Sequence, residues 1–144
     1  LVGPESLVER LADIKMQVDY GVSVLPQQVV TELMEQGLYD QGTETVRKAL
    51  RQRRDFMLKL LEKYFFDIAT WEKPTGGFFI WIKLKNQVLA ERVFNKALKE
   101  KLLVPPGTIY GSKSVSCLRL TFGYLDADIM EKSMYQLSQV IRSF

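Results

Sequence analysis

The segment 78–84, FFIWIKL, constrains the fold more than any other part of the chain, because both of its faces are apolar. Side chains alternate along a strand, so the even-numbered residues from Phe78 to Leu84 share one face, and Phe79 and Trp81 share the other. A strand that is apolar on both faces is typical of the covered middle of a sheet. The sequence therefore predicts a sheet with this segment as its central strand.

Helical periodicity surrounds this strand. Apolar residues recur at spacings of three and four in five segments, which predicts helices over 4–18, 26–36, 43–64, 87–101 and 126–144. Further short strands are predicted in 66–73, 102–104 and 117–122. This order predicts an α/β (α+β) fold, in which a small antiparallel or mixed sheet of three to four strands is covered by helices. With no repeat or linker in the sequence, we expect a single domain over residues 1–144.

The composition excludes several kinds of site. The chain has no histidine and a single cysteine, Cys117, which excludes disulfide frameworks, zinc sites and histidine-based catalysis, and we predict no metal. The net charge is +3, and the densest basic stretch is RKALRQRR at 47–54. We interpret this stretch as a solvated helix face, with a phosphate-binding patch as the alternative, and we do not expect it to bind nucleic acid.

The sequence also bears on location and completeness. Apolar runs such as FFIWI are far shorter than the ~20 residues that span a bilayer, and the start has no signal-peptide pattern. We therefore expect a cytoplasmic protein that does not enter a membrane. The first residue is not methionine, and LVG runs directly into a helix start, so we expect the chain to be a fragment of a longer protein.

One charged residue interrupts the strand CLRLTF. Arg119 stands between Leu118 and Leu120, and alternation places it on the opposite face from these leucines. A guanidinium withdrawn from water needs an anionic partner, and its planar fork matches a carboxylate. That partner could be one of the 17 acidic residues of the chain or the carboxylate of a ligand, and the residues alone do not choose between them.

Two turns accompany this strand. The segment Val104–Gly107 contains two prolines and is stiff, so it could hold Tyr110 over a pocket at little entropic cost. The segment Pro74–Gly77 contains two glycines, which would let a ligand or a neighbouring strand approach the backbone closely. The Val104–Gly107 turn could equally be a plain surface loop.

Taken in order, PTGGFFIWIKL, LLVPPGTIYG and CLRLTFGYLDADIMEKSMYQL resemble the C-terminal small domain of the fold type I aminotransferases, which use pyridoxal phosphate (PLP). The opening residues 1–28 resemble the stretch that follows the cofactor-binding lysine in that family. Within it, VGPESLVERLADIK and YDQGTETVRKALRQRRD look most like the MocR branch of the GntR transcriptional regulators, in which a winged helix-turn-helix precedes an aminotransferase-like domain.

The resemblance implies that this chain and the large domain of the intact protein bind different groups. The family's strand arginine, matched here by Arg119, receives the α-carboxylate of an amino acid, and we add Tyr110 to the predicted ligand-binding residues. None of the twelve lysines lies in the S-x-x-K type of context that forms the cofactor aldimine. We therefore expect PLP in the large domain of the intact protein, no covalent cofactor and no catalytic residue in this chain, and no enzyme activity from it alone.

The resulting functional prediction is an effector-sensing domain that binds an amino-acid-like ligand next to PLP. The intact regulator would contact DNA only through a missing N-terminal domain and would form a homodimer. Two alternatives stay open: the C-terminal domain of a genuine aminotransferase, and a free-standing ligand-binding or dimerisation module.

Overall fold

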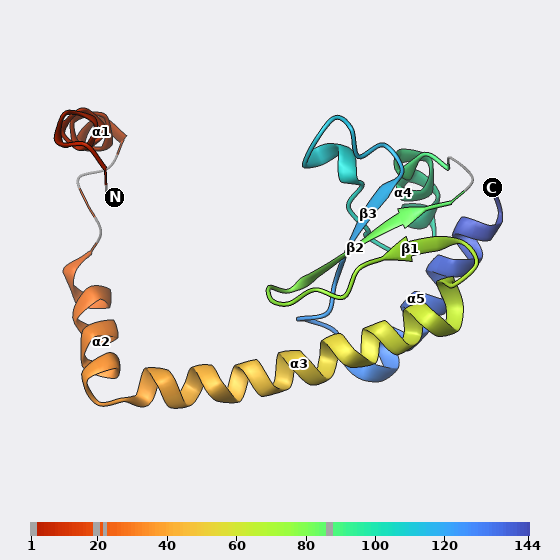
Figure 1. The fold of residues 1–144 in the computed structure, drawn as a ribbon, viewed down its shortest axis with the longest axis horizontal. Coiled ribbons are helices and arrows are strands. Elements are labelled where there is room, and N and C mark those ends of the chain that lie inside the picture. The colour runs from red at the N-terminus through yellow and green to blue at the C-terminus, as the bar shows by residue number, and fades with distance from the viewer. Residues whose placement is uncertain (1–2, 19–20, 22, 86–87) are drawn as a thin grey trace. The chain divides into compact units, whose positions relative to one another are not determined.

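The computed structural model describes residues 3–18, 21, 23–85 and 88–144 (Figure 1). By its internal contacts the chain divides into two compact units, Leu1–Thr45 and Val46–Phe144. The predicted single domain over residues 1–144 remains a prediction. Among the described residues, no helix combines the length and the apolar character needed to cross a bilayer.

The first unit is helical. It contains α1 (Glu5–Val18), α2 (Val24–Glu35) and the first turns of α3 (Leu38–Phe65), and no residue of α1 or α2 is buried. Gly37, at φ +70°, adopts the left-handed conformation that lets the chain turn between α2 and α3. The predicted start of α3 at Thr43 was wrong, because Gly42 inside the helix costs only about 1 kcal/mol relative to alanine and does not end it.

The second unit is built on a three-stranded antiparallel sheet in the order β1-β2-β3. The strands are β1 (Ala69–Trp71), β2 (Phe79–Leu84) and β3 (Cys117–Thr121). This sheet confirms the predicted fold class and the central place of the FFIWIKL segment.

The predicted strand at 102–104 does not form within the described residues. In its place the chain makes an isolated bridge between Pro106 and Leu118, followed by the short 3₁₀ helix η1 (Gly107–Ile109). Two successive prolines, which have no N–H to donate, prevent a regular ladder from continuing along this segment.

Helices cover one face of the sheet. The second half of α3, together with α4 (Ala90–Lys99) and α5 (Ala127–Arg142), packs against the inward side chains of β2 and β3 (Figure 1). Of these inward side chains, Ile82 and Leu118 are fully buried. Near the end of α3, Lys63 and Tyr64 both donate hydrogen bonds to Glu131 of α5, at 2.8 and 3.0 Å. The predicted helix over 87–101 begins at Ala90, and position 87 lies outside the described residues.

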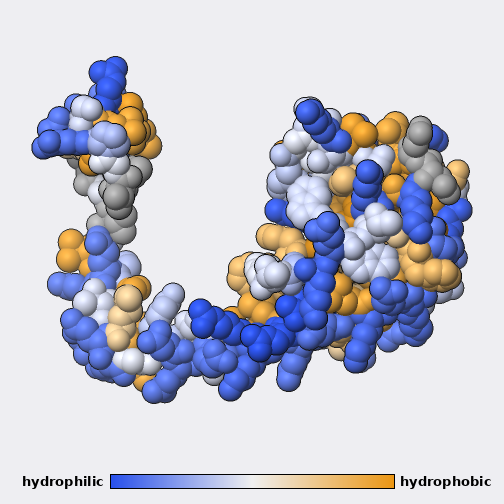
Figure 2. All heavy atoms as spheres, in the orientation of Figure 1, coloured by the Kyte–Doolittle hydropathy of each residue, from blue (hydrophilic) through white to orange (hydrophobic). Residues whose placement is uncertain are grey.

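The other face of the sheet differs from the prediction. We expected β2 to be covered on both sides, yet Phe79 is 38% exposed and Trp81 is 41% exposed. In the space-filling view of the second unit, apolar side chains are visible between charged ones (Figure 2). We call the sheet face that carries Phe79, Trp81 and Arg119 the open face.

Candidate carboxylate site on the open face of the sheet

Strand β3 presents Arg119 on the open face. Its neighbours Leu118 and Leu120 are 0% and 5% exposed and point into the helix-covered core. Arg119 itself is half-buried and lies directly opposite Trp81 in the β2–β3 ladder. The alternation of one short strand thus separates a structural face from a face that carries a charge.

Two aromatic rings hold the guanidinium of Arg119. Its central carbon lies 3.9 Å from the ring centroid of Phe79 and 4.1 Å from that of Tyr110. Phe79 pairs with Thr121 and is therefore a diagonal neighbour of Arg119 across the ladder, within reach of an aromatic side chain. Trp81 packs edge-on against Tyr110 at 5.5 Å between ring centroids. Stacking of this kind favours one orientation of the guanidinium plane.

The loop that carries Tyr110 is fixed to β3 by its backbone. The Arg119 amide donates a hydrogen bond to the Pro105 carbonyl at 3.1 Å, and the Tyr110 amide donates to the Gly107 carbonyl at 2.9 Å. Gly107 is buried, and a Cβ there would lie 2.7 Å from the Ser114 carbonyl oxygen. Only glycine allows the two sides of this loop to approach so closely.

The charge of Arg119 is not neutralised by the described part of the chain. Its Nε is buried and has no hydrogen-bond partner there. No carboxylate in the described ranges comes within ion-pair distance of it. A buried donor without a partner is costly, and an ionised group even more so, unless a binding partner completes it.

Two cavities border this arrangement. The first, of about 650 Å³, is lined by Phe79, Trp81 and Cys117 of the open face and by the segment Thr70–Thr75. The second, of about 510 Å³, is lined mainly by Lys101–Pro105, Arg119–Thr121 and one side of α5, together with Met57, Tyr124 and Leu125. Both are within the range of small-molecule sites, about 300–1,000 Å³.

The structure brings together both residues that were predicted to bind a ligand, since Arg119 stacks on Tyr110. That they bind a ligand remains a prediction. Sequence reasoning missed Phe79 and Trp81 as walls of the site. Their alternation with the core residues was visible, but it was interpreted as a second buried face.

Among the described residues, no group of His, Cys, Asp and Glu is arranged so that it could hold a metal ion. What the open face offers is a single stacked guanidinium with an unpartnered donor, which suits a carboxylate or another planar anion.

Comparison with known proteins gives two kinds of relative. The HTH-type transcriptional regulator NorG of Staphylococcus aureus (strain USA300) is 40% identical over 143 residues, which cover 99% of this chain and 32% of NorG. An uncharacterized HTH-type transcriptional regulator of Bacillus subtilis (strain 168), YdfD, is 40% identical over 142 residues, covering 99% of this chain and 30% of YdfD.

The second kind of relative is a solved enzyme. LysN, the α-aminoadipate aminotransferase of Thermus thermophilus, was crystallised with N-(5'-phosphopyridoxyl)-L-leucine. It matches with a TM-score of 0.86 and 26% identity, over 99% of this chain and 37% of LysN. The chain thus spans about a third of the length of each of these relatives. The family model for aminotransferase class I and II matches residues 1–133, and the chain therefore belongs to the aminotransferase class I and II family.

Proposed function

We propose that this chain is the aminotransferase-like effector domain of a GntR/MocR-type transcriptional regulator. In this proposal Arg119 and Tyr110 receive the carboxylate of an amino-acid-like ligand. The observation that carries the proposal is the Arg119 guanidinium, which lies over two aromatic rings while its buried Nε has no partner in the described residues. A ligand carboxylate would supply the missing charge and acceptors.

The choice of a regulator is supported by the relatives. NorG and YdfD are both named HTH-type transcriptional regulators, and the match to each covers nearly the whole of this chain. By analogy, DNA contact would come from a separate helix-turn-helix domain, and the intact protein would act in the cytoplasm as a homodimer. Ligand binding would bias the position of this domain, and that movement would be passed on to the DNA-binding domains.

PLP is proposed for the large domain of the intact protein. The crystallised LysN complex contains a phosphopyridoxyl compound, which supports a cofactor in a protein of this fold. The donor set in the described residues suits a carboxylate, and no lysine of this chain stands in the sequence context that binds the cofactor covalently. No step of the proposal is therefore assigned to PLP on this chain.

The test uses the full-length protein and the variant Arg119→Gln. The affinity for a panel of amino acids is measured by calorimetry, and the variant should lose about 2 kcal/mol or more of binding free energy, roughly 30-fold in affinity. Arg92→Gln is the matched control, because Arg92 also lies over an aromatic ring, that of Phe144 at 5.2 Å, but is not on the open face. Equal affinities in the wild type and in Arg119→Gln would refute the proposed site.

A genuine aminotransferase is the second candidate, and the likeness to LysN favours it. The two candidates share the carboxylate site and differ in the event that ligand binding triggers. A full-length protein that turns over amino and keto acids would be an enzyme, whereas one whose DNA affinity changes with the amino acid, without turnover, would be a regulator.

A further inference from the structure

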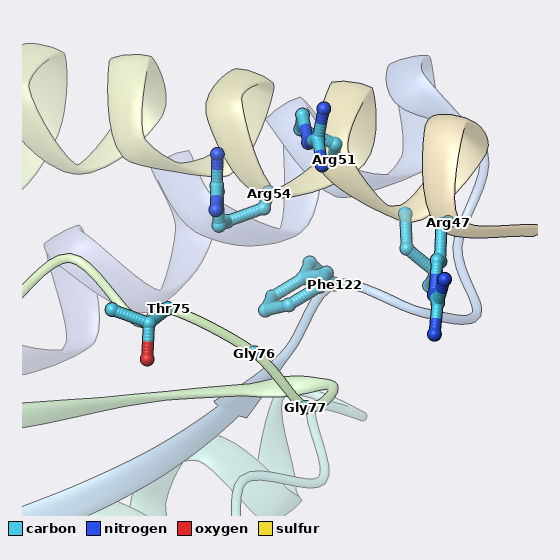
Figure 3. A pocket seen from close by; sticks show the side chains of 8 residues that line it. Arg47, Arg51, Arg54, Thr75, Gly76, Gly77 and Phe122 are labelled. Carbon is cyan, nitrogen blue, oxygen red and sulfur yellow. The ribbon is translucent and has the colours of Figure 1, made fainter. Parts of the chain in front are cut away.

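A third cavity, on the α3 side of the Pro74–Gly77 turn, has positive charge along the wall that α3 forms. It has a volume of about 300 Å³ and is lined by three arginines of α3, Arg47, Arg51 and Arg54, and by Leu50, Thr75, Gly76, Gly77 and Phe122 (Figure 3). No acidic residue is among those that line it. It shares no lining residue with the Phe79, Tyr110 and Arg119 arrangement on the open face.

The helix places the three arginines together. They are separated by four and three positions, so their side chains leave one face of α3. In Figure 2 the middle of α3 is covered almost entirely by hydrophilic side chains. An anion bound beside these arginines would gain favourable Coulomb energy.

Arg54 connects the two walls of the cavity. Its Nη1 donates a hydrogen bond to the Pro74 carbonyl at 3.2 Å, while Nε and Nη2 donate to one oxygen of Asp55 at 2.9 and 2.8 Å. The hydrogen bonds from Arg54 lower the pKa of Asp55, so this carboxylate is ionised at neutral pH and balances Arg54. The charge of Arg51 also helps to lower the pKa of Asp55, but Arg51 makes no ion pair or hydrogen bond with any described residue.

The opposite wall is open backbone. A Cβ built on Gly76 or Gly77 would meet no atom within 4 Å, and Gly77 has φ +77°. Within the described ranges, the amides of these two glycines donate no hydrogen bond. The hydroxyl of Thr75 also lines the cavity, and the buried ring of Phe122 lies between α3 and the glycines (Figure 3). Because glycine has no side chain, an anion can approach its backbone N–H group closely.

We propose that this cavity binds the phosphoryl group of a small phosphorylated molecule, through the guanidinium of Arg51, the neighbouring arginines and the amides of Gly76 and Gly77. A phosphoryl group carries about −1.5 to −2 charges and three acceptor oxygens, which matches several guanidinium and amide donors better than one carboxylate does. The cavity is larger than a single phosphate, so an organic phosphate fits it better than the bare ion. This site goes beyond the carboxylate site on the open face.

The test measures binding of radiolabelled pyrophosphate to the full-length protein by equilibrium dialysis, at constant ionic strength. The wild type should bind, and Arg51→Gln should weaken binding by about tenfold or more. Lys48→Gln is the matched control, because it removes the same charge from an exposed position on the same helix that does not line the cavity. Lys48→Gln should bind pyrophosphate like the wild type.

Two results would overturn the proposal. The first is that the wild type binds no radiolabelled pyrophosphate above background when the ionic strength is held constant with chloride. The second is that Arg51→Gln and Lys48→Gln weaken binding equally, which would reduce the effect to the general charge of α3. If pyrophosphate does not bind while Arg51→Gln lowers DNA affinity, the basic face is assigned to nucleic acid instead.

Discussion

Successive residues of β2 and β3 point to opposite faces of the sheet, and the two faces have different roles. On the helix-covered face, Ile80, Ile82 and Leu118 are at most 1% exposed and belong to the core. On the open face, Phe79 and Trp81 are about two-fifths exposed, and Arg119 has a buried donor without a partner in the described residues. One face stabilises the unit, and the other leaves side chains exposed.

This contrast indicates where unsatisfied interactions lie. A folded unit satisfies most of its buried polar groups, so an unpartnered guanidinium nitrogen on a rigid strand marks a place where binding can gain free energy. The rings of Phe79 and Tyr110 contact the guanidinium of Arg119 without neutralising it. Substitutions on one face at a time separate the two roles.

The largest effect on stability is expected from the core face. Ile82→Ala should lower the free energy of unfolding by about 2–5 kcal/mol, because it removes buried methyl groups and leaves a cavity. Trp81→Ala, one residue away on the open face, should cost only about 1 kcal/mol despite removing a larger side chain. Chemical denaturation of both variants measures the contrast, and equal losses would show that the two faces do not differ as described.

A smaller effect is expected at the loop that carries Tyr110. Gly107→Ala would place a methyl group 2.7 Å from the Ser114 carbonyl oxygen, so the loop must move, at a cost of about 1–3 kcal/mol. Gly76→Ala is the control, because a Cβ there meets nothing within 4 Å and should change stability by less than about 0.5 kcal/mol. Thermal unfolding compares them, and a neutral Gly107→Ala would mean that the loop is not tightly packed against β3.

The smallest effect is expected at the rim of the helix-covered side. Arg142 makes a two-pronged pair with Asp67, whose second contact is 2.7 Å, and hydrogen bonding to Arg142 lowers the pKa of Asp67 below its ordinary value of 3.8. A carboxylate with a depressed pKa adds stability above its unfolded pKa. That stability is lost as the pH falls through the folded pKa. The contribution is small because both side chains are partly exposed.

Acid titration of stability checks this prediction. Asp67→Asn should make the free energy of unfolding fall less steeply below pH 3.8 than it does in the wild type. Glu62→Gln is the control, since Glu62 is exposed and makes no ion pair within the described ranges. If Asp67→Asn keeps the wild-type slope, the pair adds nothing to acid stability.

Much of the fold can be predicted from local patterns. The helix α1, the strands β2 and β3, and the helix α5 after its N-cap Asp126 lie close to their predicted positions, since periodicity and end signals agree there. The predicted start of α3 was wrong because the helix tolerates Gly42. The predicted strand at 102–104 was wrong because two prolines prevent a regular ladder there. Periodicity alone weighs such single residues poorly.

The site was only half predictable. Alternation places Arg119 away from the core, but its partner could not be known, since any of 17 acidic residues could have reached it in the folded chain. Tertiary packing decides that question, as it decides which face of β2 stays uncovered. The described residues give Arg119 Nε no hydrogen-bond partner, and they leave Phe79 and Trp81 partly exposed.

Recognition of a carboxylate by Arg119 can be tested by changing the ligand and the protein separately and together. The affinities of an amino acid and its methyl ester are measured for the full-length wild type and for Arg119→Gln. We expect the wild type to favour the acid by about 2 kcal/mol and this preference nearly to vanish in the variant. A preference of the same size in both proteins would show that Arg119 does not recognise the carboxylate.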